Sequence, residues 1–212
     1  MNIVRIAAVG FVFIAASTTV FSQTDYTANL TPGQETAAPT FTMSGGGTRP
    51  ASFGSATFQL NASMDQLTMT VTITNIDING TQTPGDTNDN LAAAHIHGGQ
   101  PPGMNASVVW GFFGSPDNDN NPDQLVITPF ASGVGGTFTS IWDAPEGNST
   151  TLAAQLSNLN NGLAYINFHT VQNPGGEIRG LIVVVPEPSV LALLGVGAVA
   201  ACATIWKRRR VA

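Results

Sequence analysis

The sequence predicts an all-β domain, an antiparallel β-sandwich with one short helix, followed by a C-terminal transmembrane helix. Only 9% of the 212 residues are charged, whereas 23 are glycine and 13 are proline, a composition typical of strands and turns. Residues 66–74 alternate strictly between apolar and polar side chains, as a strand with one buried face does. Short apolar runs separated by Gly, Pro, Asn and Asp clusters recur along the chain, which favours a sandwich or a barrel.

We expect the folded domain to occupy residues 24–185. Its strands are predicted, in chain order, at residues 53–60, 66–74, 93–97, 107–113, 125–128, 137–142, 163–170 and 177–185. In the last of these, Ile178, Ile182 and Val184 share one face of the strand, which leaves Glu177 and Arg179 on the other face, where they can pair or orient their neighbours.

One helix is predicted between the strands at 137–142 and 163–170. Leucine recurs at positions 152, 156 and 159, the spacing of one helical face. Ser149 or Thr150 can cap the start of this helix, and Gly162 suits its C-terminal cap.

Residues 1–22 have the organisation of a secretory signal peptide. Arg5 precedes an apolar run at 6–16, and small or modest side chains lead to Ser22, after which we expect cleavage. The alternative is an N-terminal membrane anchor, but the run is well short of the ~20 apolar residues that a bilayer span needs. Export by the secretion machinery is therefore predicted.

The C-terminal segment 186–210 combines three features in a fixed order. Pro186-Glu187-Pro188 comes first, an uncharged apolar stretch at 190–206 follows, and the basic tail Lys207-Arg208-Arg209-Arg210 comes last. The stretch is at the short end of the ~17–25 residues of a spanning helix, and the cations are expected on its cytoplasmic side. The domain would then face away from the cytoplasm.

This three-part order resembles the PEP-CTERM sorting signal of bacteria. The resemblance implies recognition and cleavage near Pro186-Glu187-Pro188 by an exosortase-type enzyme, while the precursor is held transiently in the inner membrane. It also implies release or transfer to the cell surface or the exopolysaccharide matrix, where polysaccharide or surface proteins would be the partners. A plain tail anchor with a chance Pro-Glu-Pro is the alternative.

Charge and cysteine content exclude several classes of function. Within 24–185 the only basic residues are Arg49 and Arg179, against twelve acidic residues, so the domain would repel phosphates and is not expected to bind nucleic acid. The one cysteine, Cys202, lies in the apolar C-terminal stretch. The domain therefore contains no disulfide, no thiolate metal ligand and no cysteine nucleophile.

The three histidines all lie in strand-like segments, and strand periodicity assigns each of them to a face. His95 and His97 share one face of their strand, and His169 points away from the apolar side of its own strand, together with Asn167 and Tyr165. Two imidazoles on one strand face, with a third from a neighbouring strand, form a suitable ligand set for Zn or Cu. The alternative is structural, with the imidazoles hydrogen-bonded to loop backbone and to one another.

The histidines belong to a longer pattern of motifs. His95-Ile96-His97-Gly98 is followed by a Val-Val strand, then by residues 164–170, and finally by residues 173–180. These segments resemble the CHRD domain, which was first defined in chordin and is found widely in bacterial exported proteins. The specific part is the His strand followed in register by a motif of Gly176, Glu177, Arg179 and Gly180. Residues 26–30, with 33–35, fit the opening strand of that domain.

The resemblance to the CHRD domain spans about residues 25–184 and implies an immunoglobulin-like fold with no established catalytic activity. A second and weaker resemblance links the His-x-His strand to the copper ligands of copper/zinc superoxide dismutases. It implies a superoxide-dismutase-like Greek key as the alternative fold and a metal-dependent redox enzyme as an alternative function. The chain has no fourth histidine to complete that ligand set.

The loop at 117–123 offers a candidate calcium site. Asp117, Asp119, Asn121 and Asp123 place oxygen ligands at alternate positions, as the first half of a calcium loop does. Position six of the loop is Pro122 rather than Gly, and position twelve is not Glu, which excludes an EF-hand. A solvated turn is the alternative.

Taken together, these patterns predict an exported module of the cell envelope, cell surface or exopolysaccharide matrix, with a structural or binding role and no enzymatic activity. The sequence has neither a Gly-x-Ser-x-Gly nucleophile elbow nor a Walker-type phosphate loop. The alternative function is that of a Cu- or Zn-binding domain that uses the three histidines.

Overall fold

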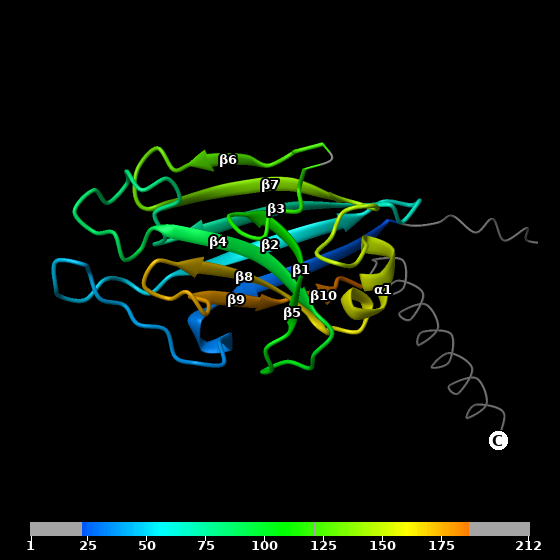
Figure 1. The fold of residues 1–212 in the computed structure, drawn as a ribbon, viewed down its shortest axis with the longest axis horizontal. Coiled ribbons are helices and arrows are strands. Elements are labelled where there is room, and N and C mark those ends of the chain that lie inside the picture. Colours follow the sequence, from blue (N-terminus) through cyan, green and yellow to red (C-terminus); the bar gives the residue numbers. More distant parts are fainter. Residues whose placement is uncertain (1–22, 121, 187–212) are drawn as a thin grey trace, which may run out of the picture.

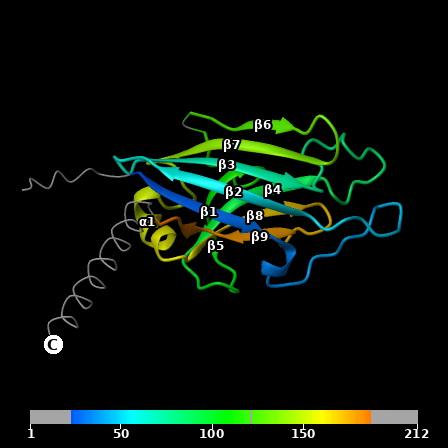
Figure 2. The same ribbon diagram turned by 180° about the vertical axis from the view of Figure 1, so that it is seen from behind.

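The computed structural model describes residues 23–120 and 122–186, which form two antiparallel sheets stacked as layers (Figure 1). The larger sheet, sheet A, has the strand order β10-β1-β2-β3-β7-β6 and faces the viewer in Figure 2. Its strands are β1 (Thr24–Leu30), β2 (Phe53–Leu60), β3 (Gln66–Thr74), β6 (Val126–Pro129), β7 (Gly135–Asp143) and β10 (Val183–Val184).

Apolar and polar residues alternate strictly along the central strands of sheet A, which gives the sheet one buried face and one exposed face. In β3, Met69, Val71 and Ile73 are fully buried, while the threonines between them face outward. Antiparallel pairing sets Val71 opposite Phe138 of β7, so apolar side chains of neighbouring strands lie on the same inner face. One face of sheet A therefore contacts the core and the other contacts solvent.

The smaller sheet, sheet B, has the strand order β5-β4-β8-β9. Its strands are β4 (Leu91–Gly98), β5 (Ser107–Phe113), β8 (Ala164–Thr170) and β9 (Ile178–Leu181). β4 follows β3 in the chain but pairs with β8, whereas β3 pairs with β7. The chain therefore crosses between the two sheets, and strands far apart in sequence become neighbours.

The hydrophobic core lies between the two sheets. Trp110 of β5 stacks on Trp142 of β7, with ring centroids 5.5 Å apart and planes 4° apart. Phe168 of β8 packs against both Phe112 and Phe138 at edge-to-face angles. The contacts of Trp110 with Trp142 and of Phe168 with Phe138 join sheet B to sheet A, whereas Phe112 and Phe168 both belong to sheet B. Aromatic pairs contribute about 0.5–1.5 kcal/mol each beyond the area that they bury.

The predicted all-β class with two antiparallel sheets and one short helix is confirmed, and most predicted strands lie within a few residues of their observed bounds. The predicted final strand at 177–185 is wrong as a single element. It divides into β9 in sheet B and β10 in sheet A, because the chain crosses between the sheets around Ile182. Ile178 and Ile182 are buried as predicted, but Val184 is 39% exposed.

The predicted helix is α1 (Leu152–Asn160), at the end of the sandwich opposite the long loops that follow β1 and β3 (Figure 1). Its N-cap is Thr151, whose side chain accepts a hydrogen bond from the backbone N–H of Ala154. Ser149 and Thr150 are therefore not the cap. Gly162 follows the C-cap residue with a φ of +64°, the left-handed conformation expected of glycine there. A short 3-10 helix, η1 (Pro32–Gln34), follows β1.

Sheet B is buried on both faces, unlike sheet A. Its inner face carries the apolar side chains, and its outer face carries polar ones that loops cover. We call these polar side chains the outer layer of sheet B. All but His169 are at most 8% exposed, and the set comprises His95, His97, Tyr165, Asn167, His169 and Arg179.

Two buried ion pairs fix the covering loops in place. Arg49 donates from both terminal nitrogens to Glu177, with N–O distances of 2.8 and 2.6 Å. Arg179 donates to Glu35 at 3.1 and 2.8 Å. Glu177 and Arg179 therefore do not pair with each other. Each instead holds a residue of the segment between β1 and β2 against sheet B.

The two glycines of the motif at 176–180 allow close approach of other groups. A Cβ on Gly180 would lie 3.0–3.1 Å from atoms of Leu30, Ala28 and Asn29, because β1 crosses directly over β9. Gly176 has a φ of +125°, and a Cβ there would lie 2.6 Å from Oε1 of Glu35. A side chain at either position would push these neighbours apart.

No helix within 23–120 or 122–186 is long and apolar enough to cross a membrane. The predicted signal peptide at 1–22, the span at 190–206 and most of the sorting segment lie outside the described residues. The same holds for Glu187, Pro188, Lys207, Arg208, Arg209 and Arg210.

We expect Arg49→Met to lower the free energy of unfolding by about 3–5 kcal/mol, because it leaves the fully buried carboxylate of Glu177 without a cation. Urea unfolding of the purified domain measures this loss. The double change Arg49→Met with Glu177→Gln should recover part of it, since no unpaired charge then remains. A loss below about 1 kcal/mol for the single change would contradict a structural role of the pair.

Candidate metal centre

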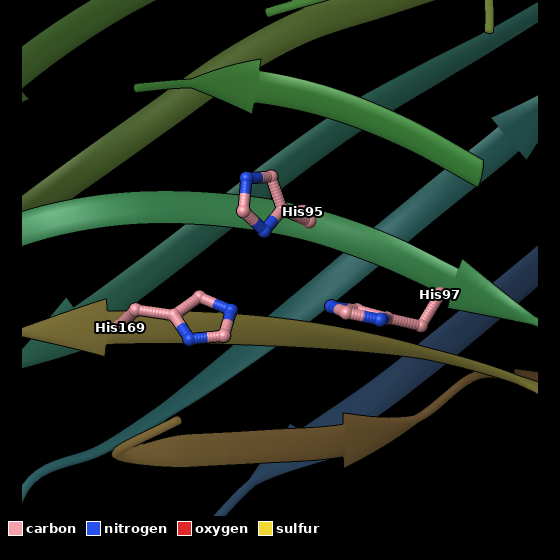
Figure 3. Close-up of side chains that lie close together, drawn as sticks. All are labelled: His95, His97 and His169. Atoms are coloured by element: carbon pink, nitrogen blue, oxygen red, sulfur yellow. The ribbon is translucent and has the colours of Figure 1, made fainter. Parts of the chain in front are cut away.

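The antiparallel pairing of β4 with β8 brings the three histidines together. His95 and His97 project from the same face of β4, and the register sets Asn167 opposite His95 and Ala93 opposite His169. His169 is therefore two residues along β8 from Asn167, the residue opposite His95, and on the same face of the strand. Figure 3 shows the rings of His97 and His169 directed toward each other, with the ring of His95 beside the space between them.

The three imidazoles are close enough to bind one ion. Their ring centroids lie 5.1 Å apart for His95 and His169, 5.8 Å for His95 and His97, and 6.1 Å for His97 and His169. One ring nitrogen from each lies within 4.8 Å of the other two. Within the part of the chain that the structure describes, this is the one group of three potential metal ligands of the His, Cys, Asp or Glu type.

Each imidazole is held by a backbone carbonyl through one ring nitrogen. Nε2 of His95 lies 3.0 Å from the oxygen of Ser115, Nδ1 of His97 lies 2.9 Å from that of Ala106, and Nδ1 of His169 lies 3.0 Å from that of Pro174. A carbonyl oxygen only accepts hydrogen bonds, so each of these nitrogens carries the proton. This arrangement is the one that metal-binding histidines commonly have.

The second nitrogen of each ring is buried and has no hydrogen-bond partner. These atoms are Nδ1 of His95, Nε2 of His97 and Nε2 of His169. In a neutral imidazole whose other nitrogen is protonated, each of them presents a lone pair. Buried polar atoms nearly always have a partner, so three unpaired lone pairs within one cluster require a physical explanation.

Burial keeps the rings neutral. Loss of hydration is the main cause that lowers the pKa of His97 from 6.5 to about 4; the neighbouring His169, His95 and Arg179 act in the same direction, and the hydrogen bond to Ala106 opposes them. Burial lowers the pKa of His169 to about 4 as well, and that of His95 in the same direction. The ligand nitrogens are therefore free of protons at neutral pH, which is the state that binds metal.

Loops position the carbonyl groups by close backbone contact. A Cβ on Gly111, opposite His95 in β5, would lie 1.8 Å from the oxygen of Pro116, so glycine there allows the loop at 114–118 to lie against His95. Ala106 accepts from His97 and its own N–H donates to the hydroxyl of Tyr165 at 3.1 Å. The loop that carries Ala106 is therefore fixed to both strands that carry the histidines.

A stack of side chains extends the site toward β9. Tyr165 stacks on His97 with ring centroids 4.8 Å apart and planes 6° apart, and the guanidinium of Arg179 lies 4.1 Å from the centre of the Tyr165 ring. Arg179 is further held by Glu35, by the oxygen of Met104 and by Asn105. Arg179 therefore acts on the site from one side as a fixed positive charge.

The carboxylates of the candidate calcium loop do not converge on one point. Asp119 turns inward, where the hydroxyl of Ser140 and the N–H of Gln124 donate to it, whereas Asp123 accepts from the N–H of Leu125 in an exposed turn. Asp117 accepts from the N–H of Asp119. Asn121 lies outside the described residues. The side chains that the structure describes in this loop thus bind local donors rather than a common point.

The partners of the outer layer could not be identified from sequence. Glu35 and Arg49 lie in the segment between β1 and β2, which has no periodic pattern. For Asn167, strand periodicity gives the face of β8 on which it lies but not its neighbours. One signal was available: the domain has only two Lys or Arg residues against twelve acidic residues, so each arginine is expected to have a defined partner.

The comparison with family models decides the identity of the domain. The model of the CHRD domain matches residues 26–182. The chain belongs to the CHRD domain family. The histidine strands and the Gly-Glu-x-Arg-Gly motif of this CHRD domain all lie within the matched range, and the predicted opening strand falls at β1 as expected. No curated protein and no solved structure matches the chain.

A second family model, the PEP-CTERM protein-sorting motif, matches residues 184–210. This match confirms the sorting signal that follows the CHRD domain and indicates an exported protein that passes through a membrane-anchored intermediate and is processed by exosortase-type machinery. Pro186 is the last described residue; it is exposed and lies two residues after the end of β10.

We expect the metal-free domain to lose stability as the pH falls from about 7.5 to about 5. His97 and His169 have a pKa of about 4 when folded, so in this range the unfolded chain takes up protons that the folded domain does not. Urea midpoints in the presence of a chelator measure this change. His169→Gln should flatten the pH dependence, whereas an equal slope in both proteins would contradict the assignment.

Proposed function

We propose that this exported CHRD domain binds a zinc or copper ion through His95, His97 and His169. The observation that carries the proposal is the hydrogen-bonding pattern of the ring nitrogens. Each has one nitrogen bonded to a carbonyl and the other unpaired, buried and close to its counterparts. A structural role would require only the carbonyl bonds, and it would leave three lone pairs buried at a cost of about 1–3 kcal/mol each.

The donor set favours zinc and copper over harder ions. Three neutral imidazoles suit Zn and Cu, whereas calcium and magnesium require carboxylate and carbonyl oxygens. Three protein ligands also leave a fourth coordination position of a tetrahedral ion for another group. When bound, such an ion would supply Lewis acidity and, in the case of copper, redox chemistry.

The charge distribution of the domain supports a role in holding cations. Arg49 and Arg179, the only Lys or Arg residues within 23–186, are both buried in ion pairs. The surface of this part of the chain therefore presents carboxylates without a surface lysine or arginine. Such a field attracts metal cations toward the domain and repels anionic polymers.

We place this activity at the cell surface or in the exopolysaccharide matrix, as the sorting motif suggests. The domain would act there as a binding module, with polysaccharide or surface proteins as neighbours, rather than as an enzyme. The pairing of β3 with β7 and of β4 with β8 supports the finer expectation of a Greek-key sandwich. Turnover of superoxide or peroxide by the copper-loaded protein would instead favour the redox alternative.

Zinc or copper should raise the melting temperature of the mature domain, purified without a His tag, at neutral pH. The bound ion stabilises only the folded state, so the rise should grow with free metal concentration and fade as protonation competes at acidic pH. Thermal melts with Zn²⁺, Cu²⁺ and Ca²⁺ test this, and Ca²⁺ should have no such effect.

His169→Gln should abolish the metal-dependent rise while leaving a folded domain, because His169 is the most exposed of the three ligands. His95→Gln and His97→Gln should abolish it too. If neither ion shifts the melting curve of the wild-type protein while these changes still destabilise it, the histidines are structural and the proposal fails.

Changing Pro186-Glu187-Pro188 to three alanines should leave an uncleaved, membrane-retained precursor, because the apolar stretch persists while the processing motif is lost. Cell fractionation and mass measurement of the product check this outcome. A control with alanines at the exposed prolines Pro101 and Pro102 should be processed normally. Equal release of both variants would favour generic proteolysis over sorting.

A further inference from the structure

A fourth buried acceptor lies beside the three histidine lone pairs. Asn167 is 1% exposed, and its side-chain oxygen, Oδ1, is buried without a hydrogen-bond partner. Asn167 lies on the same face of β8 as His169 and is paired across the strands with His95 on one side and Arg179 on the other. Directly paired residues of neighbouring strands have Cβ atoms about 4.5–5.5 Å apart.

The orientation of the Asn167 amide follows from its neighbours. Its nitrogen, Nδ2, lies against Gly176, where a Cβ would be 2.7 Å from Nδ2 and 2.6 Å from Oε1 of Glu35. Glu35 is the partner of Arg179, so Nδ2 faces the β9 side of the strand. The two amide atoms diverge from the same carbon, so Oδ1 points away from Gly176, and β4 with His95 lies on the other side of β8 from β9.

The unpaired atoms around this space are all acceptors. On β4 and β8 they are three imidazole lone pairs and one amide oxygen, and Oε1 of Glu35, on the Gly176 side of Asn167, is a further unpaired acceptor. One water donates only two hydrogen bonds, so a single group that satisfies the three imidazole lone pairs and the amide oxygen must accept lone pairs, as a metal cation does. Asparagine also carries no charge, so it can lie at such a centre without the desolvation cost of a buried carboxylate.

We propose that Asn167 is the fourth protein group of the metal centre, with its Oδ1 directed at the coordination position that the three histidines leave open. This inference rests on the proposed metal binding. It assigns a function to a residue that the structure otherwise leaves with a buried, unsatisfied oxygen. It also explains why glycine occupies position 176, since a side chain there would displace the amide of Asn167.

Two substitutions of Asn167 test the proposal by opposite effects on Zn²⁺ affinity, measured by competition with a chromophoric chelator. Asn167→Leu removes the acceptor at similar size and should weaken affinity by about 10-fold or more. Asn167→Asp places a negative charge at the same point and should tighten affinity by about 10-fold or more. Unfolding of the metal-free variants shows separately what each change does to the fold.

Asn105→Asp is the matched control, because Asn105 also contacts Arg179 but lies in the covering loop rather than on β8. It adds the same charge nearby without facing the open position, and Zn²⁺ affinity should stay within about 3-fold of wild type. Equal tightening by Asn105→Asp and Asn167→Asp would show a general charge effect and overturn the inference.

A spectroscopic readout separates a metal-facing role from a structural one. The visible absorption of the Co²⁺-loaded protein should change in Asn167→Leu and stay unchanged in Asn105→Asp, because only the first alters what surrounds the ion. If the wild-type protein binds Zn²⁺ and both Asn167 variants bind it with the same affinity and the same Co²⁺ spectrum, only this inference fails. If the wild-type protein binds neither Zn²⁺ nor Cu²⁺, the proposed function fails with it.

Discussion

The buried carboxylate of Glu177 is the constraint on which the outer side of sheet B depends. It is fully buried and accepts from Arg49, Ser52, Thr170 and Asn173, which belong to two separate loops and the end of β8. A buried charge is tolerated only when it is fully paired, so these partners must assemble together. Their assembly closes the loops over sheet B, and Arg179 with Glu35 completes the cover.

Closing the loops creates a second interior that is polar, on the opposite side of sheet B from the hydrophobic core. The low dielectric of that interior disfavours charged imidazoles, which is why the pKa values of His97 and His169 fall to about 4. The same burial leaves lone pairs and an amide oxygen unpaired. Buried unpaired polar atoms lower the stability of the fold, and natural proteins keep them chiefly where function requires them. The outer layer of sheet B is therefore the part of the domain most consistent with a functional site.

The two faces of the molecule thus have different roles. Sheet A exposes mainly threonine and other uncharged polar side chains. Sheet B carries all three histidines and Arg179, and Arg49 reaches its outer side from the segment between β1 and β2; both arginines are buried. Concentrating the cationic and ligating side chains behind one sheet leaves an acidic exterior through which metal cations approach favourably.

Sequence alone identified the sorting signal of the protein, its β-rich class and the faces on which its histidines lie. These features are local: a sorting motif is contiguous, and the two-residue period of a strand fixes the direction of each side chain. It also placed Glu177 and Arg179 in one motif, but it did not assign their partners. It treated residues 177–185 as one strand, because nothing in a short apolar run marks where a chain passes from one sheet to another.

Only the tertiary structure decided which strands pair, which ring nitrogens are free and which carbonyls hold the others. Arg49 meets Glu177 across 128 residues, and Arg179 meets Glu35 across 144. No local pattern encodes contacts at such separations, since they arise when two sheets stack and irregular loops fold over one of them. The candidate metal centre with Asn167 beside it is a product of that stacking, and strand parity alone could place its members only on compatible faces.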